Sequence, residues 1–308
     1  QYQAYAQSYS DSLTYTDAEL EAAYQADPKT YDKAAWEYVV VSGAADSTTD
    51  ADGNTVQATD EEQAAAKETA KATAEEILAA YNSGKSLESI AGNYEKATYY
   101  NTTDATYYDG VVGNWLFDDA RKDGDTEILE VGTNYYVGLF HSRGREEYKT
   151  VDIRHILITP ETGTKAQGDE GYEDEQTQLK AAARTKAEEI LAQWKSGEAT
   201  EDSFAQLAME NSADGSKYDG GLYTRVTKGW AVEEFNDWCF DASRKDGDTG
   251  IVDTTYGSHV MYFVGYDLPA WAASVTSDLQ EKASSEWSTA LSENADVQQS
   301  DFGMKFVG

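Results

Sequence analysis

Two kinds of hydrophobic spacing alternate along the chain, and each occurs twice. Residues 37–41 and 151–158 are rich in β-branched side chains and predict strands, the second running into Thr159-Pro160. Residues 74–79 and 187–194 instead place apolar side chains three or four positions apart, which predicts helices with one buried face. Since strands and helices alternate in both halves, the pattern favours an α+β chain.

The second half continues with shorter elements after its long helix, which we expect to end at Ser196-Gly197. The expected elements are, in order, a short helix near 204–208, a glycine-rich loop over 214–221, a helix over 233–242, and a hairpin of 249–253 with 258–264 around Tyr256-Gly257.

The two halves share residues in the same order, so they form an internal repeat. The matched blocks are 37–41 with 154–158, 74–79 with 187–192, 115–117 with 238–240, and 121–126 with 244–249, the last pair both reading Arg-Lys-Asp-Gly-Asp-Thr. The second copy carries about ten more residues between its first helix and its C-terminal half. We therefore expect two similar α+β units.

The ends of the chain carry helical patterns of their own. A capping box is expected at Thr16-Asp17-Ala18-Glu19, and Trp271, Val275, Leu279 and Trp287 indicate a C-terminal helix. We expect these ends to pack on each other or on a further N-terminal part. The expected segments are 1–34 (helical), 35–145 (first unit), 146–267 (second unit) and 268–308 (helical).

The charge balance excludes two classes of partner. Among 308 residues, 24 Lys and Arg face 57 Asp and Glu, giving a net charge of −33. Such a surface repels nucleic-acid phosphates and anionic lipids. No apolar run reaches the length of a membrane span, about 20 residues. The single cysteine, Cys239, has no partner for an internal disulfide, and its apolar neighbours favour a place in the core.

The three histidines are the first candidates for chemistry. Strand alternation puts His155 on the face of Ile153, and His259 on the face of Phe263, whereas His141 lies elsewhere. Two histidines on an apolar face are either hydrogen-bonded core residues or a functional pair. Neither an H-E-x-x-H motif nor paired cysteines occur, so we expect no metal and no cofactor.

Several blocks of the second unit resemble the parvulin family of peptidyl-prolyl cis/trans isomerases. They are His155-Ile156-Leu157-Ile158, Phe204-Ala205-Gln206-Leu207-Ala208, Asn211-Ser212-Ala213-Asp214, Gly220-Gly221-Leu222, Phe235-Asn236-Asp237-Trp238-Cys239-Phe240 and Gly257-Ser258-His259-Val260. The resemblance spans about residues 149–266. It implies a four-stranded antiparallel sheet wrapped by helices, in the order strand, three helices, strand, helix, two strands.

The resemblance also implies the residues of a catalytic site. His155 and His259 match the family's paired histidines, Asp214 the position of a Cys or Asp, and Thr254 a nearby hydroxyl residue. Since isomerisation breaks no covalent bond, this inventory needs neither a nucleophile nor a metal.

The substrate pocket implied by the resemblance departs from the family at one point. Leu222 and Phe235 match the apolar residues that hold the proline ring. The family usually has methionine where this chain has Ala231, and we expect either that Trp230 refills the space or that the pocket is weakened.

The first unit is predicted to have lost the site. At the positions of His155 and His259 it has Tyr38 and Tyr136, and it has no Gly-Gly-Leu. We expect a structural or peptide-binding role, with the tyrosines at 99, 100, 107 and 108 either exposed for binding or packed on their own domain. Residues 50–54 hint at a calcium loop, but its end positions lack carboxylates, which favours a polar turn.

Two such units between helical ends resemble foldases of the PrsA and SurA type. This implies an extracytoplasmic protein, secreted or lipid-anchored, whose end segments form a truncated helical chaperone module, since the chain begins at Gln1. Its expected partners are unfolded or proline-containing polypeptides, without nucleic acid or metal, and with membrane contact only through an anchor. The alternatives are a non-catalytic peptide-binding chaperone on a parvulin scaffold and a purely structural surface protein.

Overall fold

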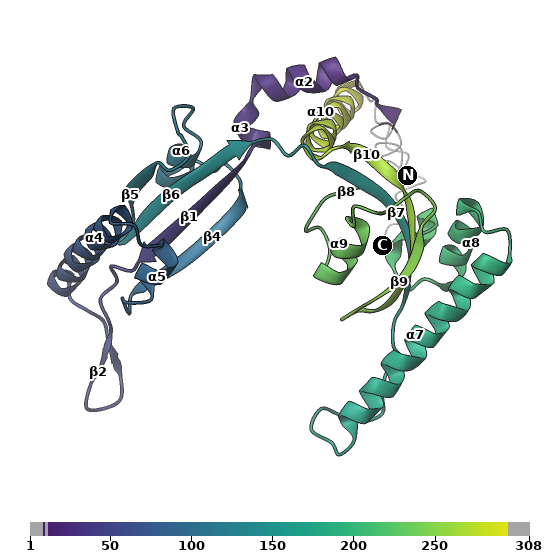
Figure 1. The fold of residues 1–308 in the computed structure, drawn as a ribbon, viewed down its shortest axis with the longest axis horizontal. Helices are drawn as coiled ribbons and strands as arrows, with labels where there is room; N and C mark the ends of the chain where they lie inside the picture. The colour runs from purple at the N-terminus through teal and green to yellow at the C-terminus, as the bar shows by residue number, and fades with distance from the viewer. Residues whose placement is uncertain (1–8, 10–11, 295–308) are drawn as a thin grey trace, which may run out of the picture. The chain divides into compact units, whose positions relative to one another are not determined.

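The chain divides into two compact units, each built around its own sheet (Figure 1). The structure, a computed structural model, describes residue 9 and residues 12–294. The first unit is Tyr15–Glu146, and the second combines residues up to Thr14 with those from Glu147 onward. Each unit has a four-stranded antiparallel sheet with helices beside it, so the predicted α+β fold with two such sheets is confirmed.

The first unit orders its sheet β4-β1-β6-β5. Its elements are α2 (Asp17–Ala26), α3 (Pro28–Tyr31), β1 (Lys33–Val41), β2 (Thr48–Thr49), β3 (Thr55–Val56), α4 (Asp60–Asn82), α5 (Leu87–Ala91), β4 (Ala97–Ala105), α6 (Val111–Leu116), β5 (Thr126–Val131) and β6 (Asn134–Gly144). The predicted capping box at Thr16 and Glu19 opens α2. The turn at residues 50–54 joins β2 to β3, and the Asp50 carboxylate accepts backbone hydrogen bonds within that turn.

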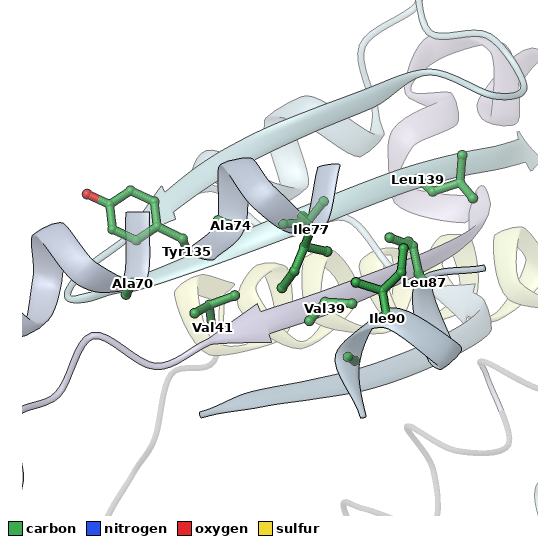
Figure 2. Packing of buried hydrophobic residues seen from close by; sticks show 11 residues of the cluster. Val39, Val41, Ala70, Ala74, Ile77, Leu87, Ile90, Tyr135 and Leu139 are labelled. Carbon is green, nitrogen blue, oxygen red and sulfur yellow. The ribbon is translucent and has the colours of Figure 1, made fainter. Parts of the chain in front are cut away.

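One face of the first sheet is covered by α4 and α5. Figure 2 shows Ile77 of α4 and Ile90 of α5 converging on Val39 of β1, and all three are at most 3% exposed. On the opposite face, Trp115 of α6 packs in a separate cluster with Trp36 of β1. The sheet is therefore buried on both sides by apolar side chains that alternate along β1.

The long helix α4 begins with a reciprocal cap. Thr59 Oγ1 accepts the Glu62 N–H, and the Glu62 carboxylate accepts the Thr59 N–H in return. Thr59→Ala is expected to lower the free energy of unfolding of the first unit by about 1 kcal/mol, because the backbone N–H of Glu62 loses its acceptor. Urea denaturation measures this change. Thr69→Ala, an exposed substitution inside α4, is the control and should cost nothing, and equal losses would contradict the cap assignment.

The second unit orders its sheet β8-β7-β10-β9. Its elements are β7 (Lys149–Ile158), α7 (Tyr172–Ser196), α8 (Glu201–Asn211), the 3₁₀ helix η1 (Gly215–Asp219), β8 (Leu222–Val226), α9 (Glu233–Cys239), β9 (Thr249–Thr254), β10 (Gly257–Pro269) and α10 (Ala270–Asn294). This is the predicted order of strand, three helices, strand, helix and two strands. The shorter first unit has no counterpart of η1 between α5 and β4.

The two faces of the second sheet carry different helices. Phe204 of α8 packs with Ile156 of β7 in one cluster, together with residues of α7. Phe235 and Cys239 of α9 pack with Ile153 in another. Cys239 is fully buried, and this burial raises the pKa of its thiol to about 12, so the thiol is inert at neutral pH. Strand alternation places His155 on the α9 side, two residues beyond Ile153.

The repeated Arg-Lys-Asp-Gly-Asp-Thr motif has the same structure in both units. The Arg121 guanidinium lies 4.5 Å from the Trp115 ring centre, and the Arg244 guanidinium lies 4.0 Å from that of Trp238. Each arginine also donates to the carbonyl of its tryptophan at 3.1 Å. The motif therefore links the helix before it to the strand after it in both units. Its role is structural.

The helix α10 packs against the start of the chain within the second unit. Gln280, which is 8% exposed, donates to the Leu13 carbonyl at 3.1 Å, and the Tyr9 and Trp287 rings stack with centroids 5.2 Å apart. Residues 1–8 and 295–308, parts of the predicted helical ends, lie outside the described residues. Within the described part of the chain, the helices are too short or too polar to cross a membrane.

Candidate functional site

A cavity of about 460 Å³ opens on the α9 side of the second sheet. It gathers residues from β7, β8, α9, β10 and the segments between them, including Asp214, the N-cap of η1. The lining residues are His155, Asp214, Tyr223, Gly229, Trp230, Ala231, Val232, Phe235, Tyr256 and His259. Polar and apolar groups therefore meet in one recess, although they lie up to 104 positions apart in the sequence.

Two consecutive glycines set the position of the strand that carries Tyr223. Gly220 and Gly221 both have positive φ, at 66° and 75°. A Cβ atom on Gly221 would lie 2.3 Å from the His155 carbonyl oxygen, so only glycine fits beside β7 there. The Arg154 guanidinium donates to the carbonyl oxygens of Asp219 and Gly220 at 2.9 and 3.0 Å, which holds this turn against the sheet.

The two histidines are linked edge to edge at the base of the cavity. His155 Nδ1 and His259 Nδ1 are 3.1 Å apart, and the ring planes differ by 17°. His259 Nε2 lies 2.9 Å from Thr254 Oγ1, which also accepts the Tyr256 N–H. On the other side, His155 Nε2 lies 3.3 Å from Asp214 Oδ1, a contact not aligned as a hydrogen bond. The four polar residues predicted from the resemblance are thus brought together.

The charges in this chain of contacts fix its proton positions. An ionised Asp214 carboxylate requires a proton on the nearby His155 Nε2, because a lone pair there would face a negative charge. We therefore assign donation from Thr254 O–H to His259 Nε2, and from His259 Nδ1–H to His155 Nδ1. Both imidazoles are neutral in this arrangement.

The pKa values agree with neutral imidazoles beside an ionised carboxylate. Burial lowers the pKa of His155, and burial together with the neighbouring His155 ring lowers the pKa of His259 to about 4. Burial acts to raise the pKa of Asp214, but hydrogen bonds from Ser216 and Tyr223 outweigh it and hold that pKa at about 2. The cavity therefore presents one fixed negative charge at neutral pH.

The apolar part of the cavity is built on Phe235. Its ring meets both imidazoles edge-on, with centroids 5.4 Å from His155 and 5.3 Å from His259. Ala231 leaves room beside it, and the Trp230 ring lies 6.3 Å from Phe235. Trp230 thus lies beside Phe235 in the same cavity as Ala231.

One predicted pocket residue does not line the cavity. Leu222 pairs with Arg154 across the strands, whereas Tyr223 pairs with Ile153 and points to the α9 side. The Tyr223 hydroxyl donates to Asp214 Oδ1 at 2.9 Å. Thr254 also lies outside the lining and reaches the site only through its hydrogen bond to His259.

Sequence reasoning missed four lining residues, which are Gly229, Val232, Tyr223 and Tyr256. Strand alternation from His155 through the β7–β8 register would have found Tyr223, but the register depends on the conformation of the Gly220-Gly221 turn. Tyr256 lies in the predicted hairpin turn, and nothing in its spacing marks it as part of the site.

The first unit holds tyrosines where the second holds its histidine pair. Tyr38 faces Gly138 across the strands as His155 faces Met261, and Tyr136 faces Val40 as His259 faces Leu157. The Tyr38 and Tyr136 rings are near-parallel, with centroids 5.8 Å apart. Tyr100 and Tyr108 are exposed, whereas the hydroxyl of Tyr99 bonds to Glu37 and that of Tyr107 to Asn114.

A family model and several known proteins match parts of this chain. Residues 137–264 match the family described as the PPIC-type PPIASE domain. The foldase protein PrsA 1 of Listeria innocua is 29% identical over 142 residues, a match that covers 44% of this chain and 39% of the relative. The chain thus matches well under half the length of this curated relative.

Two solved structures are also similar. PrsA from Bacillus subtilis is 23% identical, with a TM-score of 0.33, over 51% of this chain and 54% of that one. NmPin, the parvulin of Nitrosopumilus maritimus, is 25% identical, with a TM-score of 0.26, over 38% of this chain and 98% of that one. Residues 137–264, most of which lie in the second unit, thus match the PPIC-type peptidyl-prolyl isomerase domain, and over the matched part the chain resembles the PrsA foldases.

Proposed function

We propose that the second unit catalyses cis/trans isomerisation of prolyl bonds in unfolded polypeptides, as part of an extracytoplasmic foldase. The cavity carries this proposal, because its apolar floor at Phe235 adjoins the polar chain from Thr254 to Asp214. We propose His155, Asp214, Thr254 and His259 as the polar catalytic set, and Phe235, Ala231 and Trp230 as the substrate-binding residues, with Tyr223 replacing Leu222.

The proposed mechanism relies on the environment of the amide. Its resonance sets a barrier of about 18–20 kcal/mol, and the twisted state has lost that resonance. A proline ring held on Phe235 would place the amide in a recess with little water, where the less polar twisted state is favoured relative to the planar one. The neutral histidine pair would keep this recess free of positive charge, and the hydrogen bonds between the two rings and from Thr254 to His259 would keep its shape.

Two-dimensional NMR exchange of a short X-Pro peptide with the full chain tests the proposal. We expect faster cis/trans exchange with the unchanged protein and at least a tenfold loss in Phe235→Ala or His155→Ala, because either change opens the cavity. His141→Ala in the first unit is the matched control and should exchange the peptide normally. Tyr38→Ala should also have no effect if the first unit is inactive. Unchanged exchange in both cavity variants would refute the site.

A second function is favoured by one observation, the small side chain of Ala231 in the pocket floor. A pocket floor that makes few contacts with the proline ring would bind peptide without accelerating its cis/trans exchange. The protein would then act as a peptide-binding chaperone. The same NMR experiment separates the two functions. Peptide shift changes without exchange would favour the chaperone, which should also suppress aggregation of unfolded clients with and without proline.

A further inference from the structure

The cavity wall carries a negative charge that has no lysine or arginine partner among the described residues. Asp214 Oδ1 accepts the Ser216 N–H at 2.8 Å and the Tyr223 O–H at 2.9 Å, while Oδ2 has no hydrogen-bond partner among the described residues. Among the described residues, His155 is the only basic side chain within 4 Å of the carboxylate, and neither a lysine nor an arginine lies that close. A partly exposed carboxylate that stays ionised is thus left facing the cavity.

Two aromatic rings at the rim of the same cavity have no basic side chain of the described residues over them. Trp230 is 49% exposed and Tyr256 is 64% exposed, and both line the cavity. Ring faces attract lysine and arginine. Elsewhere the chain places its own cations over aromatic rings. Arg121 lies over Trp115 and Arg244 over Trp238, as described above. The Lys228 ammonium lies 4.7 Å from the centre of the Tyr148 ring. In the described residues no basic side chain lies over the two rim rings.

We propose that the cavity recognises a lysine or arginine that flanks the proline, with its cation held between the Asp214 carboxylate and the rings of Trp230 and Tyr256. This inference rests on the proposed isomerase function. The cavity volume of about 460 Å³ falls within the ~300–1,000 Å³ usual for ligand sites, and so leaves room beside a proline ring. The net charge of −33 also draws basic segments towards the protein and repels acidic ones.

Exchange measurements on matched peptides test the preference. The blocked peptides are Ala-X-Pro-Ala and Ala-Pro-X-Ala, with X as arginine, lysine, norleucine or glutamate. Their cis/trans exchange is measured by NMR in the presence of the full chain. For at least one of the two positions of X, before or after the proline, we expect kcat/KM to be about tenfold higher for the arginine or lysine peptide than for the norleucine peptide. The glutamate peptide should have a lower kcat/KM than the norleucine peptide. The preference should shrink in 1 M NaCl, because salt screens the ion pair.

Two variants that remove one negative charge separate the cavity from the general surface. Asp214→Asn keeps the side-chain cap of η1. It should bring the ratio of kcat/KM for the arginine peptide to that for the norleucine peptide close to one, whatever the absolute rate. Asp219→Asn, an exposed acid outside the lining, should keep the ratio. Equal rates for arginine and norleucine in the unchanged protein, or a ratio that survives Asp214→Asn, would overturn the inference. Exchange of no peptide at all would instead refute the isomerase function on which it rests.

Discussion

Gly221→Ala is expected to destabilise the second unit by about 3 kcal/mol or more. The added Cβ would lie 2.3 Å from the carbonyl oxygen of His155, and the residue would keep a φ of 75° that alanine rarely adopts. Neither strain can relax without moving β7 or β8, because the Gly221 carbonyl also accepts the His155 N–H at 2.9 Å. Urea denaturation gives the loss in stability, and peptide exchange should fall with it.

Gly247→Ala is the matched control for this change. Gly247 has a φ of 85°, but its nearest neighbour to an added Cβ is the Tyr262 hydroxyl, 3.9 Å away. Alanine there suffers only the backbone strain, about 1 kcal/mol. If Gly221→Ala cost no more than Gly247→Ala, the close approach of the turn to His155 would be refuted.

Acidification below neutral pH is expected to remove up to about 3 kcal/mol of stability through His259. Its pKa is about 4 in the folded protein and about 6.5 in the unfolded chain, so the unfolded chain binds the extra proton first. The full contribution is present above pH 6.5 and declines as the pH falls towards 4. The lowered pKa of His155 acts in the same direction, whereas Asp214 stays ionised throughout this range.

The difference between the unchanged protein and His259→Gln isolates this effect from the many surface carboxylates. The stability advantage of the unchanged protein over the variant should shrink by up to about 3 kcal/mol between pH 7 and pH 4. Imidazole nitrogen shifts in NMR would show directly whether His259 stays neutral at pH 5.5. Parallel stability curves, or a His259 that titrates near 6.5, would contradict the buried, neutral pair.

The strand pattern and the repeat predicted strands in both units, whereas the four-stranded sheet was implied by the family resemblance. The edge strand β4 (Ala97–Ala105) was missed because one of its faces is mostly exposed, and its polar residues carry no apolar alternation. The hairpin of β2 and β3 was missed because two-residue strands leave no periodic signal. Apolar spacing reports burial, so elements that bury little are invisible to it.

The site shows a different limit of sequence reasoning. The two histidines could be placed on one face because each lies within a long, regular strand, where alternation fixes the face. Leu222 and Tyr223 follow directly after two glycines in left-handed conformations, and a shift of one residue there exchanges the faces of the strand. Which of the two points into the cavity therefore depends on three-dimensional contacts, chiefly those of Gly221 with β7.

The hydrogen bond from Gln280 to the Leu13 carbonyl bears on how the protein is made. The first unit is one continuous stretch, Tyr15–Glu146, so a ribosome delivers all of it early. The second unit needs residues from both sides of that stretch, and its N-terminal part must wait until α10 has emerged. We expect vectorial synthesis to impose an order in which the first unit folds first, and the second unit is completed only after α10 has been translated.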